Sequence, residues 1–508
     1  MSSLKLDRLD RESQDLVSET MTILDGWWDE QVGLIRQAPD DAPVPGPDAP
    51  HMVRESALYA IGLLMRNQPG DKARANRVIN LVLDHQFDEP GQYYHGTFYR
   101  YPEEPHPPVR SLIWRDYDPN WREFIGNSLS IILSRFSDDL EPGLETRLDN
   151  ALKLIIAGNL TRPLPANYTN IALMKAFMLV FAGDRFNNPE WIALGEALAE
   201  EIYALFDETG CFEEYNSPTY YGVDLKALGM WVTFSSSPRL RELGARMESL
   251  LWQDIARFYH AGMKNMSGPY DRSYGMDMRK YVTSVGISMR IGLGKELAAL
   301  PDTNVAPENF QATHKNDLVS SMWAAAVGVR IPEEARAVFT SFSGERSVER
   351  LIQKSPQRIA TAWLTEDLML GAEDASASKP VWNQYHLATM HWRSTNNDVA
   401  WLKLMNFLPA DARVEKNNLK IKSFVWHGLG GEERVFVFRA YTPDAPAGVT
   451  ISPEQWQFPG LKVRVETNIE GPFVSRNGPF TEIRYEANHK DGGFHIFFNL
   501  TVEALPLS

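Results

Sequence analysis

The stretch RLRELGARMESLLWQDIARFYHAG, residues 239–262, carries apolar side chains every three or four positions. Leu240, Leu243, Met247 and Leu251 form such a series, which is the spacing of one face of an α-helix. Counting weaker cases, about ten segments of the first 300 or so residues show this pattern, separated by Pro, Gly and Asp/Asn clusters. The clearest others are ESALYAIGLLMRN (55–67), FIGNSLSIILSRF (124–136), RLDNALKLIIAGNL (147–160), IALMKAFMLVFAG (171–183), EWIALGEALAEEIYALF (190–206) and VDLKALGMWVTF (223–234). Helices in such succession predict a helical array, a solenoid or a toroid.

The pattern changes after about residue 330, where apolar and polar residues begin to alternate. The segments are RAVFTSFSGERSVERLIQ (336–353), RIATAWLTEDLMLGA (358–372), NDVAWLKLMNF (397–407), ERVFVFRAYTP (433–443), GLKVRVETNIEG (460–471), FTEIRYEAN (480–488) and GFHIFFNLTVEA (493–504). Gly, Pro and Asn turns separate them, which indicates a β-sandwich. The sequence therefore predicts a helical domain over residues 1–325 and an antiparallel β domain over residues 326–508.

Composition limits the partners. The net charge of −15 argues against nucleic acid, because phosphate binding needs a basic face. No apolar run approaches the length that spans a bilayer, so no membrane partner is expected. The first 21 residues lack the features of a signal peptide, which predicts a cytoplasmic protein, or a secreted one if the chain was already trimmed. The single cysteine, Cys211, excludes an internal disulfide and a cysteine-based zinc site, and we expect it to be a buried small hydrophobe.

Polar residues gather at the start of one predicted helix, in CFEEYNSPTYYGVDLKALGMW (211–231). Ser217 and Pro218 suit a helix start. Tyr220 and Tyr221 then fall in the first turn, where the positive helix end slightly favours a phenolate. The two tyrosines either pack together or, beside Asn216 and two glutamates, form part of a site.

Four further stretches combine aromatic, amide and charged residues. In SGPYDRSYGMDMRKY (267–281), Arg272 and Arg279 lie among tyrosines, a combination that suits a carboxylate-bearing sugar, although surface ion pairs with nearby aspartates are equally compatible. Asn167 either caps a helix or belongs to a site. The other candidates are Trp114, Asn120 and Trp121 in IWRDYDPNWREFIGNSL (113–129), and His386, His391 and Arg393 in YHLATMHWRSTNND (385–398). Their spacing matches no zinc signature, and no nucleotide-binding or serine-hydrolase motif is present.

Taken together, these stretches resemble the polysaccharide lyases built from a helical toroid and a β-sandwich. The resemblance covers roughly residues 110 to 435 and is closest to family 8, the hyaluronate, chondroitin and xanthan lyases, with alginate-lyase and heparinase-like features. NWREFIGNSLSIIL resembles the family's N-W-x-x-E-I-G-x-P helix, and ANYTNIALMKAFMLVFAGD its A-N segment, which places the catalytic Asn on Asn167. GCFEEYNSPTYYGVDLKAL is similar to its D-G-S-F-x-Q-H…Y-G-x-x-L segment, which places the catalytic Tyr on Tyr221, whereas the alginate-lyase version favours Tyr220.

Other segments extend this resemblance. GPYDRSYGMDMRKY is similar to the family's arginine loop, and MHWRS through ARVEKNN resembles the opening of its sandwich, with Arg413, Glu415 and Asn418 in matching places. The family histidine should fall near Tyr215 or Asn216, and neither position holds one. The implied architecture is an incomplete (α/α) toroid followed by an antiparallel β-sandwich. The implied partner is an acidic carbohydrate, bound by a monomer or homodimer without a cofactor or metal.

The resemblance also implies a mechanism, β-elimination at a 4-linked uronate. Asn and Arg donors neutralise the carboxylate while charge builds in the transition state, here Asn167 with Asn216. A tyrosine whose pKa is lowered by cationic neighbours moves the proton. Arg272, counted among the catalytic residues, and Arg279 hold the acidic sugar and favour the phenolate. Further substrate contacts are expected from Trp114, Asn120, Trp121, Tyr215, Tyr274, His391 and Glu415.

Two other functions remain open on the sequence. A hydrolase would need two carboxylates about 5 to 10 Å apart, for which Glu213, Glu214 and Asp224 are candidates. A non-catalytic carbohydrate-binding or repurposed protein is also compatible with the missing histidine.

Overall fold

The computed structural model describes residues 3–38, 49–375, 384–394, 398–405, 409–425, 435–443, 448–486 and 494–505. By their contacts the residues form two compact units. The first unit consists of Met1–Phe206, Gly222–Ser249 and Arg279–Ile331. The second consists of Asp207–Tyr221, Leu250–Met278 and Pro332–Ser508. Two segments from the helical part of the sequence thus group with the strands, and a simple division at residues 325 and 326 stays a prediction.

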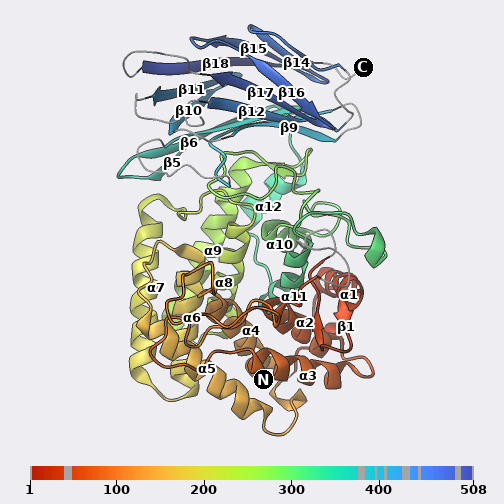
Figure 1. Cartoon of the computed structure of the whole chain (residues 1–508), viewed down its shortest axis with the longest axis vertical. Helices are drawn as coiled ribbons and strands as arrows, with labels where there is room; N and C mark the ends of the chain where they lie inside the picture. The colour runs from red at the N-terminus through yellow and green to blue at the C-terminus, as the bar shows by residue number, and fades with distance from the viewer. Residues whose placement is uncertain are drawn as a thin grey trace. The chain divides into compact units, whose positions relative to one another are not determined.

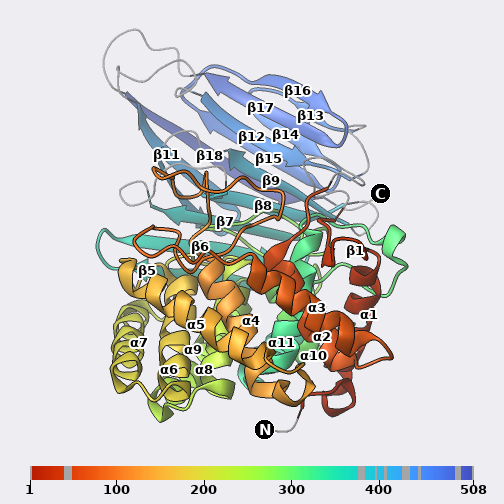
Figure 2. The ribbon, with the colours of Figure 1, turned by 60° about the horizontal axis from the view of Figure 1, so that its bottom comes forward.

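The helical part contains twelve α-helices within the described ranges (Figure 1). They are α1 (Arg11–Asp25), α2 (Val53–Arg66), α3 (Asp71–Asp84), α4 (Trp121–Arg135), α5 (Leu144–Thr161), α6 (Thr169–Arg185), α7 (Pro189–Thr209), α8 (Tyr220–Phe234), α9 (Pro238–Phe258), α10 (Ser284–Leu293), α11 (Ser321–Val327) and α12 (Glu333–Thr340). In the first unit α2 contacts α1, α3 and α4, and α4 contacts α5 and α6. The late helices α10 and α11 return to contact α1 (Figure 2), as expected when an array of helices curves into a toroid.

Local sequence sets the ends of these helices. Asp10 caps α1, because its side chain accepts a hydrogen bond from the backbone N–H of Ser13. Thr283 caps α10 in the same way, through the N–H of Gly286. Asn67 ends α2 in the left-handed conformation, with φ of 53°. The apolar series that begins at Leu240 is buried, so the helical prediction for residues 239–258 is confirmed.

The β part is one antiparallel sheet of 14 strands in the order β13-β14-β15-β18-β11-β10-β7-β8-β9-β12-β17-β16, with β6 pairing β7 and β5 pairing β6 (Figure 1). The strands are β5 (Glu345–Gln353), β6 (Arg358–Thr365), β7 (Leu368–Asp374), β8 (Ala388–Arg393), β9 (Val399–Met405), β10 (Ala410–Glu415), β11 (Asn418–Val425), β12 (Val435–Tyr441), β13 (Thr450–Ile451), β14 (Gln455–Phe458), β15 (Leu461–Thr467), β16 (Phe473–Asn477), β17 (Phe480–Glu486) and β18 (Phe494–Ala504). Two short hairpins, β1 (Trp28–Asp29) with β2 (Leu34–Ile35) and β3 (Tyr259–His260) with β4 (Asn265–Met266), lie outside this sheet.

The long sheet folds back on itself. Phe438 of β12 lies 5.1 Å from Trp456 of β14 between ring centroids, although these strands are far apart in the sheet order. Trp392 of β8 lies 5.4 Å from Phe458 of β14. Contacts across the sheet face at such separations require two packed layers, with one buried core between them. The predicted helical array followed by an antiparallel β-sandwich is therefore confirmed.

One local prediction was wrong. The strand-like pattern expected from Arg336 onward begins with helix α12, and the strand β5 starts only at Glu345. Pro332 at the N-cap and two glutamates in the first turn favour the helix. Phe339 is the large apolar side chain that this helix buries. The predicted loop at residues 38–50 lies mostly outside the described residues.

Candidate functional site

A pair of tyrosines and an arginine come together in the second unit. Tyr220 is the first residue of α8, and Ser217 caps this helix by accepting the N–H of Tyr220 at 3.0 Å. The hydroxyl of Tyr220 lies 2.7 Å from that of Tyr274 in the 267–278 loop. The guanidinium of Arg272 lies 4.0 Å from the centroid of the Tyr220 ring, a cation–π contact. Sequence reasoning singled out all three, and the structure brings them together.

Arg272 is held in place by two polar partners. Its Nη1 donates to Glu214 at 2.9 Å, and its Nε donates to the side-chain oxygen of Gln384 at 2.8 Å. Its side chain retains 22% exposure, so the cation is accessible while its orientation is fixed. The site therefore offers an anchored positive charge beside a phenol.

The electrostatics of Tyr220 differ from the sequence prediction. Arg272 acts to lower the pKa of Tyr220, as expected of a cationic neighbour. Burial is the largest influence, however, and together with Tyr274 it raises the pKa of Tyr220 well above its usual range. In the unliganded protein Tyr220 is therefore a protonated phenol.

The adjacent Tyr221 has a different environment. Its side chain is fully buried, and its hydroxyl donates to Asp254 at 3.3 Å. Asp254 also accepts from Arg350 at 3.0 Å, and the ring of Tyr215 packs edge-on against Tyr221. Burial raises the pKa of Tyr221 well above its usual range. Tyr221 and Tyr215 thus belong to the packing beneath the site.

A buried charge network supports the two loops of the site. Arg358 donates to both carboxylate oxygens of Asp271 at 2.7 Å and to Glu373 at 2.7 Å, and all three side chains are at most 1% exposed. Asp271 also accepts the N–H of Tyr215 at 3.2 Å. Sequence reasoning missed Arg358, because a lone arginine in a strand carries no local signal of partners so distant in the chain.

Asn216 joins the same two loops. It adopts a left-handed conformation with φ of 51°, and its Nδ2 donates to the carbonyls of Ser267 and Pro269, both at 2.8 Å. The amide nitrogen of Asn216 is thereby occupied within the protein.

Two predicted histidines lie beneath the 267–278 loop. His391 is fully buried and its Nε2 donates to the carbonyl of Met276 at 2.9 Å. His386 donates to the carbonyl of Ser273 at 3.2 Å. Burial lowers the pKa of His391 to about 4, so both its position and its neutral state suit a support for the loop.

Other predicted residues lie elsewhere. Glu415 is exposed and pairs with Lys420 at 2.6 Å on the sandwich. Cys211 is buried as expected, with its sulfur 3.6 Å from the carbonyl of Ile352, and burial raises the pKa of its thiol to about 12. Arg279 is half-buried and belongs to the first unit.

The first unit also holds Asn167, Asn120, Trp121 and Trp114. The side chain of Asn120 donates to Tyr168 and accepts from Arg162, both at 2.9 Å. The ring of Trp121 lies 4.5 Å from the guanidinium of Arg54. Trp114 is 49% exposed, and Asn167 is exposed two residues before α6. Their roles stay predictions.

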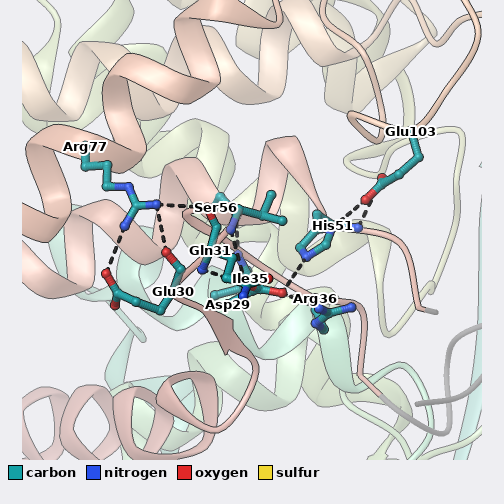
Figure 3. Close-up of polar contacts among 10 residues, drawn as sticks. Asp29, Glu30, Gln31, Ile35, Arg36, His51, Ser56, Arg77 and Glu103 are labelled. Carbon is teal, nitrogen blue, oxygen red and sulfur yellow. Dashed lines mark hydrogen bonds and ion pairs between the residues drawn. The ribbon is translucent and has the colours of Figure 1, made fainter. Parts of the chain in front are cut away.

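A second polar cluster of the first unit, shown in Figure 3, had no signal in the sequence. His51 lies between two carboxylates: its Nε2 is 3.2 Å from Asp29, and its Nδ1 contacts Glu103. Asp29 also pairs with Arg36. A backbone hydrogen bond from Val32 is the largest influence that lowers the pKa of Asp29 below its usual range. This arrangement joins the β1–β2 hairpin to the loop of Glu103.

Within the described ranges no three His, Cys, Asp or Glu side chains are grouped so as to hold a metal ion. No described helix combines the length and apolar character needed to cross a membrane.

Comparison with known proteins gives a family but no activity. A family model described as Domain of unknown function (DUF8769) matches residues 14–329, and one described as Domain of unknown function (DUF8770) matches residues 345–499. No curated protein matches the sequence. Among solved structures, heparinase III is similar at a TM-score of 0.45 and 9% identity, over 98% of this chain and 86% of that one. The heparan sulfate lyase HepC from Pedobacter heparinus is similar at a TM-score of 0.31 and 10% identity, over 98% and 83% of the two chains. Likeness at this level carries no conclusion about activity.

Proposed function

This chain belongs to the DUF8769 family, and we propose that it is a lyase that cleaves a 4-linked uronate in an acidic poly- or oligosaccharide by β-elimination. The observation that carries the proposal is the contact of the Tyr220 hydroxyl with that of Tyr274, at 2.7 Å, while Arg272 lies 4.0 Å from the Tyr220 ring. A phenol that can gain and lose a proton beside a fixed cation is what this elimination requires.

The reaction begins at the carbon next to the uronate carboxyl group. Its proton is weakly acidic, and its removal places negative charge on the carboxylate. Tyr220 first loses its own proton to solvent, and the phenolate oxygen then takes the proton from that carbon. A carbon–carbon double bond forms, and the bond to the 4-linked oxygen breaks. The phenol then returns a proton to the leaving oxygen, so a single residue serves as base and acid.

The neighbours of Tyr220 help the phenolate to form. Burial keeps Tyr220 protonated in the free protein, so ionisation must be favoured by the surroundings once substrate is bound. Tyr274 can donate a hydrogen bond to the phenolate oxygen, and Arg272 attracts the negative charge. Arg272 is also the cation that we assign to the substrate carboxylate. The amide nitrogen of Asn216 is occupied by two carbonyls, and a role for Asn167 stays a prediction.

Ultraviolet absorbance of the conjugated product tests the proposal, on a panel of uronate polymers and oligosaccharides. Tyr220→Phe should lower kcat/KM about 10²- to 10⁴-fold, the usual contribution of a proton-transfer residue. Tyr221→Phe is the matched control. It loses one buried hydrogen bond to Asp254, so we expect about 1 kcal/mol of destabilisation and nearly unchanged turnover.

Three results would contradict the proposal. Full activity of Tyr220→Phe on the best substrate would remove its central residue. Release of reducing sugar without absorbance would indicate hydrolysis, for which Glu213, Glu214 and Asp224 are the candidate carboxylates. If neither absorbance nor reducing sugar increases with any substrate of the panel, the proposal that this chain is a lyase is refuted.

A further inference from the structure

Three aromatic side chains cluster on the outer face of the sandwich. Trp401, Tyr441 and Phe480 are register neighbours on β9, β12 and β17. Ring centroids are 5.6 Å apart for Trp401 and Tyr441, 5.4 Å for Tyr441 and Phe480, and 6.1 Å for Trp401 and Phe480. Each ring is partly exposed, because strand alternation sends their neighbours Leu402, Ala440 and Thr481 to the opposite, buried side.

Two cations lie in the next row of the same face. Lys403 pairs in register with Arg439, and Arg439 with Glu482. The amine of Lys403 is 5.8 Å from the Trp401 ring, and the guanidinium of Arg439 is 5.3 Å from the Phe480 ring. Glu482 pairs with Arg439 at 3.1 Å, and both side chains are 40% exposed. We call the set of these side chains the aromatic–cation row; it consists of Trp401, Lys403, Arg439, Tyr441, Phe480 and Glu482.

Positive charge exceeds negative charge in this row. Among the described residues no carboxylate forms an ion pair with Lys403, while Glu482 pairs with Arg439. Burial, with Arg439 as the next cause, lowers the pKa of Lys403 to about 8, which is the response of an amine that lacks a counter-ion. A local positive excess stands out in a chain whose net charge is −15. An anionic ligand would complement it.

The row begins beside the strand that holds the loop of the candidate site. Trp401 pairs in register with His391 on β8, whose imidazole holds the 267–278 loop through Met276. Lys403 pairs with Thr389 of the same strand. Burial, with Lys403 as the next cause, lowers the pKa of His386, which holds the loop at Ser273. The row therefore begins on β9, next to the strand whose His391 holds the 267–278 loop, within the same unit.

We propose that the aromatic–cation row is an accessory binding surface for an acidic saccharide, which holds sugar units of the substrate beyond the one that reacts. Rigid aromatic side chains supply contact area for the sugar rings at low entropic cost. Lys403 and Arg439 bind the carboxylate or sulfate groups, and Arg can do so with two hydrogen bonds. The proposal rests on the proposed function for the nature of the ligand.

Calorimetric titration of the full chain tests this inference, with a uronate hexasaccharide and its carboxyl-reduced, neutral counterpart as probes. The Lys403→Gln, Arg439→Gln double variant should bind the acidic probe about tenfold more weakly or worse, because hydrogen bonds to charged groups are lost. Trp401→Ala should weaken binding of the acidic probe as well. Arg464→Gln, which removes an exposed arginine on β15, is the control and should bind like the parent chain. Circular dichroism checks each variant for folding, and Lys403→Arg should retain binding if charge is the cause.

The outcome separates this inference from the proposed function. Tyr220→Phe should lose turnover but keep its affinity, whereas the double variant should lose affinity. If the double variant binds more weakly while neither the parent chain nor any variant turns over substrate, the accessory binding surface is supported and the proposed lyase activity is refuted. Equal affinity of the double variant and the parent chain, equal affinity for the neutral probe, or no binding of the acidic probe at all would overturn the inference.

Discussion

Replacing Arg358 with methionine removes a cation that bridges two buried carboxylates. Arg358 donates to Asp271 at 2.7 Å and to Glu373 at 2.7 Å, and none of the three side chains is more than 1% exposed. Methionine has a similar length and fills most of the same space. The substitution therefore isolates the loss of charge and hydrogen bonds from the loss of packing.

The expected cost is about 3 to 5 kcal/mol, the range found when one partner of a buried ion pair is removed. Protonation gives the same scale, since forcing a carboxyl with an ordinary pKa of about 4 to be neutral at pH 7 costs roughly 4 kcal/mol. The cost should shrink as the pH falls toward 4, because the two carboxyls that have lost the cation then take up protons in the unfolded chain too.

Urea unfolding followed by circular dichroism, at pH 7 and pH 4.5, measures this difference. Arg413→Met is the matched control: Arg413 pairs with Glu349 at 2.5 Å, but the two side chains are 37% and 64% exposed, so we expect less than about 1 kcal/mol. If Arg358→Met costs no more than the control, or if its cost is the same at both pH values, the network does not stabilise the fold in the way described.

Two further predictions concern stability. Gly371→Ala should destabilise the protein by about 3 kcal/mol or more and lower its activity, because the new Cβ would lie 1.9 Å from the carbonyl oxygen of Gly268 and would push the 267–278 loop off β7. Thermal unfolding measures the loss of stability, and the absorbance assay measures the loss of activity. An unchanged Tm would contradict this close approach. Glu248→Gln should stabilise the protein above pH 7 and not below about pH 4.5. Burial raises the pKa of Glu248 to about 7, so the folded protein holds this proton more tightly than the unfolded chain and loses stability as the pH rises through that window, by at most about 3 kcal/mol. Unfolding free energies of both chains across pH 4 to 8 measure the difference, and parallel curves would contradict the raised pKa.

Periodicity was sufficient to predict most of the fold. The apolar spacing in residues 239–258 and the alternation in residues 461–467 and 494–504 each match an observed element, because burial of one face determines both patterns. Helix α12 was misread because its eight residues are too few to establish a helical period, so its capping residues were the better signal. The grouping of residues 207–221 and 250–278 with the strands depends on long-range contacts that no local pattern reports.

The candidate site was predicted in part. The doubled tyrosine and the arginine loop were recognisable because polar residues at a helix start are unusual. Which tyrosine is accessible could not be predicted, since successive helix residues point about 100° apart and the partner Asp254 lies on another helix. Likewise, the occupied amide of Asn216 depends on carbonyls about 50 residues away along the chain. The assignment to family 8 within the polysaccharide lyases stays a prediction.

The inert state of Cys211 has a practical consequence. Its thiol is buried, and its raised pKa leaves almost no thiolate at neutral pH. Maleimide reagents should therefore not react with Cys211 in the folded chain. A cysteine placed at Asn477, which is exposed on β16 and pairs in register with Phe480 of β17, would then be the single reactive thiol on the folded chain. An environment-sensitive fluorophore at that position would report the arrival of a ligand beside Phe480, with no background from a native thiol.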